Sequence, residues 1–300
     1  MKKSITLLLV VFITWIGTDL ARAETTIELS HAVTGERFEY LIQQGDSLTS
    51  IAARFGESPT TIAQRNGIDY NGPIYPGQRL EIDNRHIVPE TLENGILINL
   101  PQRMLFFFRD GGLVGAYPVG LGKPTWPTPT GQFSVVQLVK NPTWTVPIAI
   151  QEEMRQARDV VLIKVPPGPD NPLGKYWIRI SLPGYGIHST NAPPSVYQFR
   201  SHGCIRLQPE DAEKLFHEVT IGTTGEIIYA PVLLAVLADG RIFLEVNRDV
   251  YSEGINVLQI FNSLTEANHL KDRIDWQKAG QVVEKQEGIA IQINLQTETQ

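Results

Sequence analysis

Proline and glycine interrupt residues 95–230 so often that the sequence favours short strands over long helices. The run 166–174 reads Pro-Pro-Gly-Pro-Asp-Asn-Pro-Leu-Gly, and Pro142 and Pro147 precede it. Proline lacks a backbone donor and clashes inside a helix, so residues 142–174 are expected to form rigid loops with no long helix. Elsewhere, runs rich in Ile, Val, Phe and Tyr lie between the breaks, as in strands. We therefore predict a mainly β domain over residues 95–230, with the Phe106-Phe107-Phe108 run in its core.

The first 23 residues have the form of a secretory signal peptide. Lysines follow Met1, residues 5–16 form an almost unbroken apolar run, and Ala21-Arg22-Ala23 has the small-x-small form of a cleavage site. The apolar run is shorter than the roughly 18 to 20 residues of a spanning helix, which favours a signal peptide over an uncleaved anchor. We expect cleavage after Ala23 and export from the cytoplasm.

Composition limits the partners and the number of domains. The 26 basic residues are dispersed among 32 acidic ones, and the net charge of -6 offers no basic patch for nucleic acid. The chain is longer than one compact core usually needs, so two or more domains are expected.

Residues 37–83 predict a small α+β unit in the order strand, helix, helix, strand. Phe38, Tyr40 and Ile42 alternate as in a strand, and Gly45-Asp46-Ser47 precedes a helical pattern. The unit resembles a LysM domain in its Gly-Asp-Ser-Leu, Ile-Ala, Asn66 and Gly-Gln-Arg-Leu positions. LysM domains bind N-acetylglucosamine polymers such as peptidoglycan. That resemblance implies a sugar groove formed by Gly45, Asp46, Ser47, Leu48, Ile74, Pro76 and Gly77. For any one of them, a role in shaping the turn is an equal alternative.

Two other segments flank the β domain. Residues 84–94 are expected to form a linker. Residues 231–300 predict an α/β appendage, with a hairpin around Asp239-Gly240, a helical pattern over 258–276 and a short strand at 289–293.

Cys204 is the only cysteine, so it cannot form an internal disulfide. A free cysteine is commonly a small buried hydrophobe, but its neighbours here suggest chemistry. A histidine can take the thiol proton and create the nucleophilic thiolate. His188 lies 16 residues earlier, so the intervening loop must fold back, and a hairpin-like return is expected. Gly203 lets backbone N–H groups approach a developing oxyanion.

The segment from His188 to Ser201-His202-Gly203-Cys204 resembles the signature of the L,D-transpeptidases of the YkuD type. The likeness extends to Thr-Pro-Thr-Gly-Gln-Phe at 128–133 and to the two proline-rich stretches. With the LysM unit and the signal peptide, it is most similar to the ErfK/YbiS branch of periplasmic enzymes. The resemblance implies a β-sandwich-like catalytic fold with no metal or organic cofactor.

Family roles then fall on matching positions. Cys204 is the nucleophile, His188 the base, and Ser189 orients that base through its carbonyl, while His202 and Gly203 shape the oxyanion region. Arg206 either pairs with a substrate carboxylate or braces the loop. Further candidates near the substrate are Ser201, Asn191, Tyr176 and Trp177.

The implied reaction makes a Cys204 thioester with the meso-diaminopimelate of a peptidoglycan tetrapeptide, releases D-alanine, and passes the acyl group to an amine. The acceptor is a second diaminopimelate, giving a 3-3 cross-link, or the lysine of an outer-membrane lipoprotein. A carbapenem would acylate Cys204. The alternatives are an L,D-carboxypeptidase or cysteine peptidase, a zinc site at His188, His202 and Cys204, and a non-catalytic glycan-binding wall protein.

Overall fold

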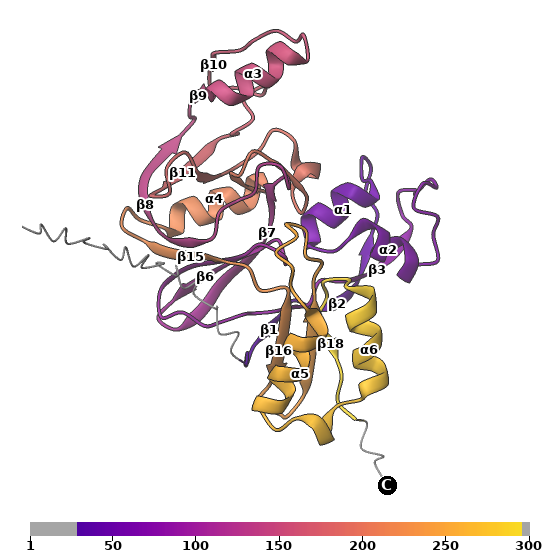
Figure 1. Cartoon of the computed structure of the whole chain (residues 1–300). Coiled ribbons are helices and arrows are strands. Elements are labelled where there is room, and N and C mark those ends of the chain that lie inside the picture. The colour runs from indigo at the N-terminus through magenta and orange to yellow at the C-terminus, as the bar shows by residue number, and fades with distance from the viewer. Residues whose placement is uncertain (1–28, 296–300) are drawn as a thin grey trace, which may run out of the picture.

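A computed structural model describes residues 29–295, and the expected signal peptide lies outside these residues. Figure 1 shows three regions along this part of the chain: a small N-terminal unit, a central sheet domain that carries a projecting flap, and a C-terminal unit. No helix within residues 29–295 has the length and apolar character that crossing a membrane requires.

The N-terminal unit has two helices between two paired strands. Strand β2 (Arg37–Leu41) pairs antiparallel with β3 (Arg79–Asp83), and α1 (Leu48–Phe55) and α2 (Pro59–Arg65) lie between them in sequence. Ser47 caps α1 through a reciprocal capping box with Ser50. The helices bury their apolar faces in a small separate core, which includes Ile51, Ile62 and Leu80.

The central domain is built on one continuous sheet. Its strands are β5 (Gly95–Asn99), β6 (Met104–Arg109), β7 (Gly112–Gly122), β8 (Gly131–Lys140), β11 (Tyr176–Ile180), β12 (Gly186–His188), β13 (Phe199–Ser201), β14 (Ile205–Leu207) and β15 (Thr224–Ile228). Their order is β13-β7-β14-β12-β11-β8-β15-β5-β6, and β6 also pairs with β7. The sheet therefore closes on itself. This corrects the sandwich-like expectation: β7, at 11 residues, is long enough to pair with β6 along one part and with β13 and β14 along another.

Alternation along β6 explains the aromatic run that the sequence placed in the core. Phe107 packs into the main core, while Phe106 and Phe108 point to the opposite face, where they meet a second cluster that includes Phe243. All three are buried, which confirms the prediction. Helix α4 (Pro209–Glu218) packs Ala212 and Leu215 into the main core.

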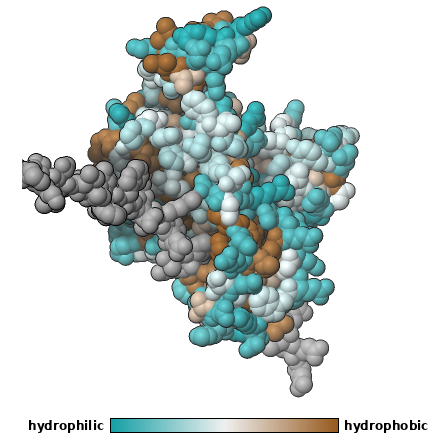
Figure 2. Space-filling model, in the orientation of Figure 1, coloured by the Kyte–Doolittle hydropathy of each residue, from teal (hydrophilic) through white to brown (hydrophobic). Residues whose placement is uncertain are grey.

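A flap projects from the central domain between β8 and β11 (Figure 1). It contains β9 (Trp144–Thr145), α3 (Ile148–Gln156) and β10 (Lys164–Val165), and β9 pairs with β10. A nine-residue helix was not expected among these prolines. It forms because Pro147 stands at its N-cap, where the missing backbone donor costs nothing. No residue of α3 is buried, and Figure 2 shows apolar side chains among polar ones on this projection.

Residues 84–94, which were expected to form a linker, pack against the rest of the molecule. Within them, β4 (His86–Ile87) pairs with β1 (Val33–Thr34). The His86 side chain is buried, with Nδ1 3.0 Å from Glu245 Oε1 and Nε2 2.9 Å from the Gly56 carbonyl oxygen. This one side chain thus ties the N-terminal unit to the C-terminal unit.

The C-terminal unit is a three-stranded sheet covered by helices. Strand β17 (Ile242–Val246) lies between β16 (Val232–Val236) and β18 (Ile291–Gln292). Helices α5 (Val257–Ala267) and α6 (Trp276–Lys285) contribute Phe261 and Ala279 to a core around β16 and β17. Two short 3-10 helices, Pro193–Ser195 and Lys271–Arg273, complete the elements of residues 29–295.

Candidate active site

Strands β12 and β14 bring the two halves of the sequence signature together. They pair in parallel, with Ile187 opposite Ile205 and His188 opposite Arg206. The expected hairpin-like return is therefore wrong: a hairpin pairs its strands antiparallel, whereas residues 189–204 cross over through β13. Ile187 and Ile205 enter the main core, so the alternating neighbours His188 and Arg206 project to the opposite face. Cys204 immediately precedes β14, and the charge of Arg206 acts on its thiol.

His188 is held as a neutral base. Its ring is buried, and Nδ1 lies 2.5 Å from the carbonyl oxygen of Ser189. A carbonyl only accepts, so Nδ1 carries the proton and Nε2 keeps a free lone pair. Burial and then the positive charge of Arg206 lower the pKa of His188 to about 3, against the opposing effect of the Ser189 hydrogen bond. The imidazole is thus unprotonated at neutral pH and able to accept a proton.

Cys204 is half-buried and lines a cavity of about 570 Å³. The residues that line this cavity include Trp177 and Tyr185, together with Trp144 of the flap. Burial raises the pKa of the Cys204 thiol, while a backbone hydrogen bond from Gly186 and the charge of Arg206 act in the opposite direction. The thiol therefore needs a base to become a nucleophile at neutral pH.

Arg206 places a positive charge that acts on both His188 and Cys204. Its side chain is half-buried, and its Nε is buried with no hydrogen-bond partner within residues 29–295. A guanidinium stays protonated even where burial lowers its pKa, as it does here. Arg206 thus favours both the neutral imidazole of His188 and the thiolate of Cys204.

Ser201 and Thr128 brace the loop before the nucleophile. Ser201 Oγ donates to the Cys204 carbonyl oxygen at 2.6 Å and accepts from the Gly203 N–H at 3.1 Å. Thr128 Oγ1 donates to the Gly203 carbonyl oxygen at 2.9 Å. Gly203 adopts a φ of +97°, and a Cβ there would lie 2.4 Å from the Tyr185 ring. The Gly203 N–H is occupied by Ser201, so this glycine contributes backbone shape rather than a free oxyanion donor in this arrangement.

His202 points to the flap. Its Nε2 lies 2.7 Å from Glu153 Oε2 on α3, and Lys123 Nζ lies 3.0 Å from Glu153 Oε1. The hydrogen bond with His202, and next that with Lys123, lower the pKa of the Glu153 carboxyl. The edge of the Trp126 ring also packs on His202. His202 therefore connects the Cys204 loop to the flap, whereas the His188 ring contacts the Ser189 carbonyl.

The other substrate-binding candidates divide into three kinds. Trp177 lines the cavity, with its ring 5.8 Å from that of His188. Tyr176, one residue earlier, faces the opposite side of the strand and is buried in the main core, with its hydroxyl on Glu213. It is therefore a packing residue. Asn191 is exposed and does not line the cavity.

The positions expected to form the sugar groove lie on two loops of the N-terminal unit. Gly45, Ser47, Pro76 and Gly77 are exposed, and Ile74 is half-buried against the core. Leu48 is buried in that core, so it supports the loop rather than facing a sugar. Asp46 accepts from Tyr40 Oη at 2.6 Å and from the Gln43 N–H at 2.9 Å, which fixes the turn.

Lys123, Glu153 and Tyr185 contribute to the site although no local pattern in the sequence pointed to them. Thr128 stood in a motif that the sequence did reveal, but without a role. Within residues 29–295, no three His, Cys, Asp or Glu side chains lie together as metal ligands. His202 binds Glu153 and His188 binds the Ser189 carbonyl, so the two imidazoles serve different partners.

Comparison with known proteins agrees with this geometry. Residues 93–232 match the L,D-transpeptidase catalytic domain family, YkuD, and residues 40–83 match the LysM domain family. The probable L,D-transpeptidase ErfK/SrfK of Salmonella typhimurium is 30% identical over 256 residues, which cover 82% of each chain. The chain belongs to the L,D-transpeptidase family.

Other members of the L,D-transpeptidase family match over shorter stretches. The probable L,D-transpeptidase YbiS of Escherichia coli is 36% identical over 173 residues, covering 57% of this chain and 56% of that one. The catalytic domain of the E. faecium L,D-transpeptidase, solved by NMR, is 26% identical, with a TM-score of 0.35, and covers 46% of this chain and 98% of that one. The two family matches and the ErfK/SrfK relative show that the enzyme is an L,D-transpeptidase with a LysM domain in front of its catalytic domain.

Proposed function

We propose that this L,D-transpeptidase works outside the cytoplasm, in the periplasm, through a thioester on Cys204. The donor is a peptidoglycan tetrapeptide stem. The LysM domain keeps the enzyme on the glycan strand, which raises the local concentration of stems. The signal-like residues 1–23 support export, with cleavage after Ala23.

The arrangement of His188, Cys204 and Arg206 carries the proposal. His188 Nε2 takes the thiol proton, and the thiolate attacks the carbonyl carbon between meso-diaminopimelate and the terminal D-alanine. The C–N bond breaks, and His188 returns the proton to the leaving D-alanine amine. A thioester between Cys204 and diaminopimelate remains. Arg206 favours the thiolate state by its charge.

An amine acceptor then resolves the thioester. His188 removes a proton from the incoming amine, the new amide forms, and Cys204 leaves as the thiol. The acceptor is a second diaminopimelate, which gives a 3-3 cross-link, or the lysine of an outer-membrane lipoprotein. Water in the same place would make the enzyme an L,D-carboxypeptidase. Carbapenems are expected to acylate the same sulfur.

Incubating the mature enzyme with disaccharide-tetrapeptide tests the proposal. We expect D-alanine release and a covalent adduct on Cys204, detected by mass spectrometry, with neither product from Cys204→Ala. Adding a lipoprotein C-terminal peptide tells apart the two acceptors. Unchanged D-alanine release by Cys204→Ala would refute the mechanism, and no release by the intact enzyme would support a non-catalytic glycan-binding protein.

A further inference from the structure

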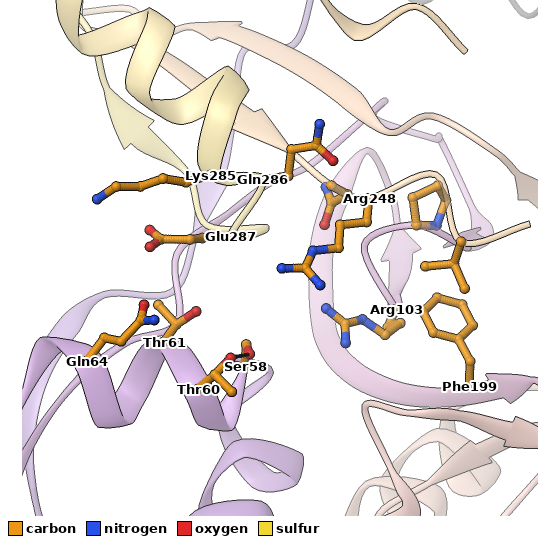
Figure 3. A pocket seen from close by; sticks show the side chains of 13 residues that line it. Ser58, Thr60, Thr61, Gln64, Arg103, Phe199, Arg248, Lys285, Gln286 and Glu287 are labelled. Carbon is orange, nitrogen blue, oxygen red and sulfur yellow. Dashed lines mark hydrogen bonds between the residues drawn. The ribbon is translucent and has the colours of Figure 1, made fainter. Parts of the chain in front are cut away.

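A second cavity, of about 490 Å³, lies where the LysM domain, the catalytic sheet and the C-terminal unit meet (Figure 3). Helix α2 supplies one wall, with Thr60 and Gln64. Arg103 and Phe199 come from the catalytic domain, and Arg248 comes from the C-terminal unit. The cavity shares no lining residue with the one at Cys204. It is therefore a separate site made by all three regions.

Positive charge is concentrated in this cavity. Arg103 and Arg248 direct their guanidinium groups into the same open space (Figure 3), and Lys285 and Glu287 stand at its edge. In the part of the chain that the structure describes, none of these four side chains belongs to an ion pair. Three cations and one carboxylate thus meet here in a chain whose net charge is -6. An anionic ligand would relieve the repulsion between the two guanidinium groups.

Arg103 is fixed in place before any ligand arrives. Its guanidinium carbon lies 3.8 Å from the centre of the Tyr197 ring, and Nη1 donates to the Tyr197 carbonyl oxygen at 3.1 Å. Its Nε is buried and has no hydrogen-bond partner among residues 29–295. A guanidinium held in this way loses little conformational entropy on binding a carboxylate.

The other residues that line this cavity have side chains that can bind a ligand made of sugar and peptide. Ser58, Thr60 and Gln64 offer hydroxyl and amide groups, which both donate and accept hydrogen bonds. Phe199 offers an apolar ring against which the face of a sugar can pack. Few of the lining residues are apolar, so a purely hydrophobic ligand would gain little here.

A smaller cavity extends this site along the LysM domain. It measures about 320 Å³, is bounded by Thr49 and Tyr70 of the N-terminal unit, and shares Arg103 and Phe199 with the first cavity. The two together offer room for a ligand longer than one sugar. Phe199 opens β13, which ends at Ser201 in the nucleophile loop, so a ligand here touches the strand that leads to Cys204.

We propose that this cavity binds a second, carboxylate-bearing glycopeptide of peptidoglycan while the donor stem occupies the Cys204 cavity. The inference rests on the proposed function, since it takes peptidoglycan as the substrate. Muropeptides carry free carboxylates, hydroxyls and acetamido groups, which the two guanidinium groups and the polar wall complement. A lysine-ended lipoprotein peptide has an ε-ammonium group beside its terminal carboxylate and lacks the sugar hydroxyls, so it complements this lining less well.

Binding to the full mature chain tests the proposal, with Cys204→Ala in every sample to prevent turnover. Disaccharide-tetrapeptide is titrated by calorimetry into this protein and into versions carrying Arg248→Glu or Lys285→Glu. Arg241→Glu is the matched control, because Arg241 lies in the same unit, is exposed, pairs with Asp239 and lines neither cavity. The neutral N-acetylglucosamine tetramer reports LysM binding separately.

Binding at the Cys204 cavity and at the LysM sugar groove should stay the same, whereas Arg248→Glu and Lys285→Glu should each weaken one further binding event by about tenfold or more. Arg241→Glu and the neutral tetramer should show no change. If Arg248→Glu destabilises the fold, Lys285→Glu still tests the proposal. Equal affinity in all the variants, or equal weakening of the neutral tetramer, would overturn the proposal.

D-alanine release, measured with Cys204 intact, separates this inference from the proposed function. Release that persists in Arg248→Glu together with unaltered glycopeptide affinity refutes the second site and leaves the proposed function standing. Absence of release in the unmodified enzyme refutes the proposed function, whatever the cavity binds.

Discussion

His188 and Arg206 lie directly opposite each other on the parallel strands β12 and β14, which places a fixed cation beside the base. The burial of His188 and the charge of Arg206 both disfavour an imidazolium. In cysteine enzymes that rest as a thiolate–imidazolium ion pair, the charged histidine stabilises the thiolate. In this enzyme Arg206 carries that charge, and His188 remains free to accept a proton.

The stability that His188 contributes should be lost as the pH drops below about 6.5. The pKa of His188 is about 3 in the folded protein, against about 6.5 in the unfolded chain. Between these values only the unfolded state gains the proton, so acid favours unfolding. The part of the loss due to His188 between pH 7.5 and pH 5 should be about 2 kcal/mol, which is the difference in pH dependence between the enzyme and His188→Asn. Urea unfolding of the enzyme and of His188→Asn measures it; an equal pH dependence in both would contradict this origin.

Replacing Arg206 by alanine should make the Cys204 thiol harder to ionise. Burial raises the pKa of that thiol and the charge of Arg206 opposes this effect, so loss of Arg206 should raise the pKa further and slow alkylation at pH 7 by roughly severalfold. The rate of iodoacetamide modification against pH measures this. Arg206→Lys should recover part of the rate, because it keeps the charge. Arg179→Ala is the control, since Arg179 lines the same cavity but is not among the groups that shift the thiol; an equal loss there would argue against Arg206.

Gly203→Ala should abolish acylation of Cys204, whereas Gly222→Ala should not. Both glycines have φ near +95°, at +97° and +94°. Both substitutions therefore carry backbone strain of about 1 to 2 kcal/mol. Only the Cβ at 203 meets a ring, 2.4 Å away in Tyr185, while the Cβ at 222 meets nothing within 4 Å. Carbapenem labelling and thermal unfolding of both variants separate the two effects.

Glu153→Gln should loosen the flap. It removes the charge that holds His202 and Lys123 to α3. Hydrogen exchange over residues 148–156 should quicken by roughly two- to fivefold, because surface ion pairs are weak singly but two act here. Glu152→Gln is the matched control: among residues 29–295, the Glu152 carboxylate forms an ion pair with Arg155 on the same helix and with no other side chain. Equal exchange in both variants would show that the flap is held by other contacts.

Local patterns predicted a large part of this molecule. The aromatic run at 106–108, the order of elements in residues 37–83 and the Cys204 loop are all readable from neighbouring residues, because periodicity and turn chemistry act over a few positions. The helix α3 was missed, since prolines on both sides of it resemble loop signals although Pro147 begins the helix. The sheet closure was missed because it depends on β7 pairing with three other strands.

The sequence by itself determined which residues we propose for the chemistry: one cysteine, a histidine 16 residues before it, and a glycine at the point where only a left-handed backbone fits. Tertiary structure alone decided how they work together. It set the parallel register that puts Arg206 beside His188, turned His202 to Glu153 on the flap, and formed the cavity around Arg103 and Arg248. These relationships join segments that are far apart in the chain. A pattern of neighbouring residues does not predict them, because it does not specify which distant groups come into contact on folding.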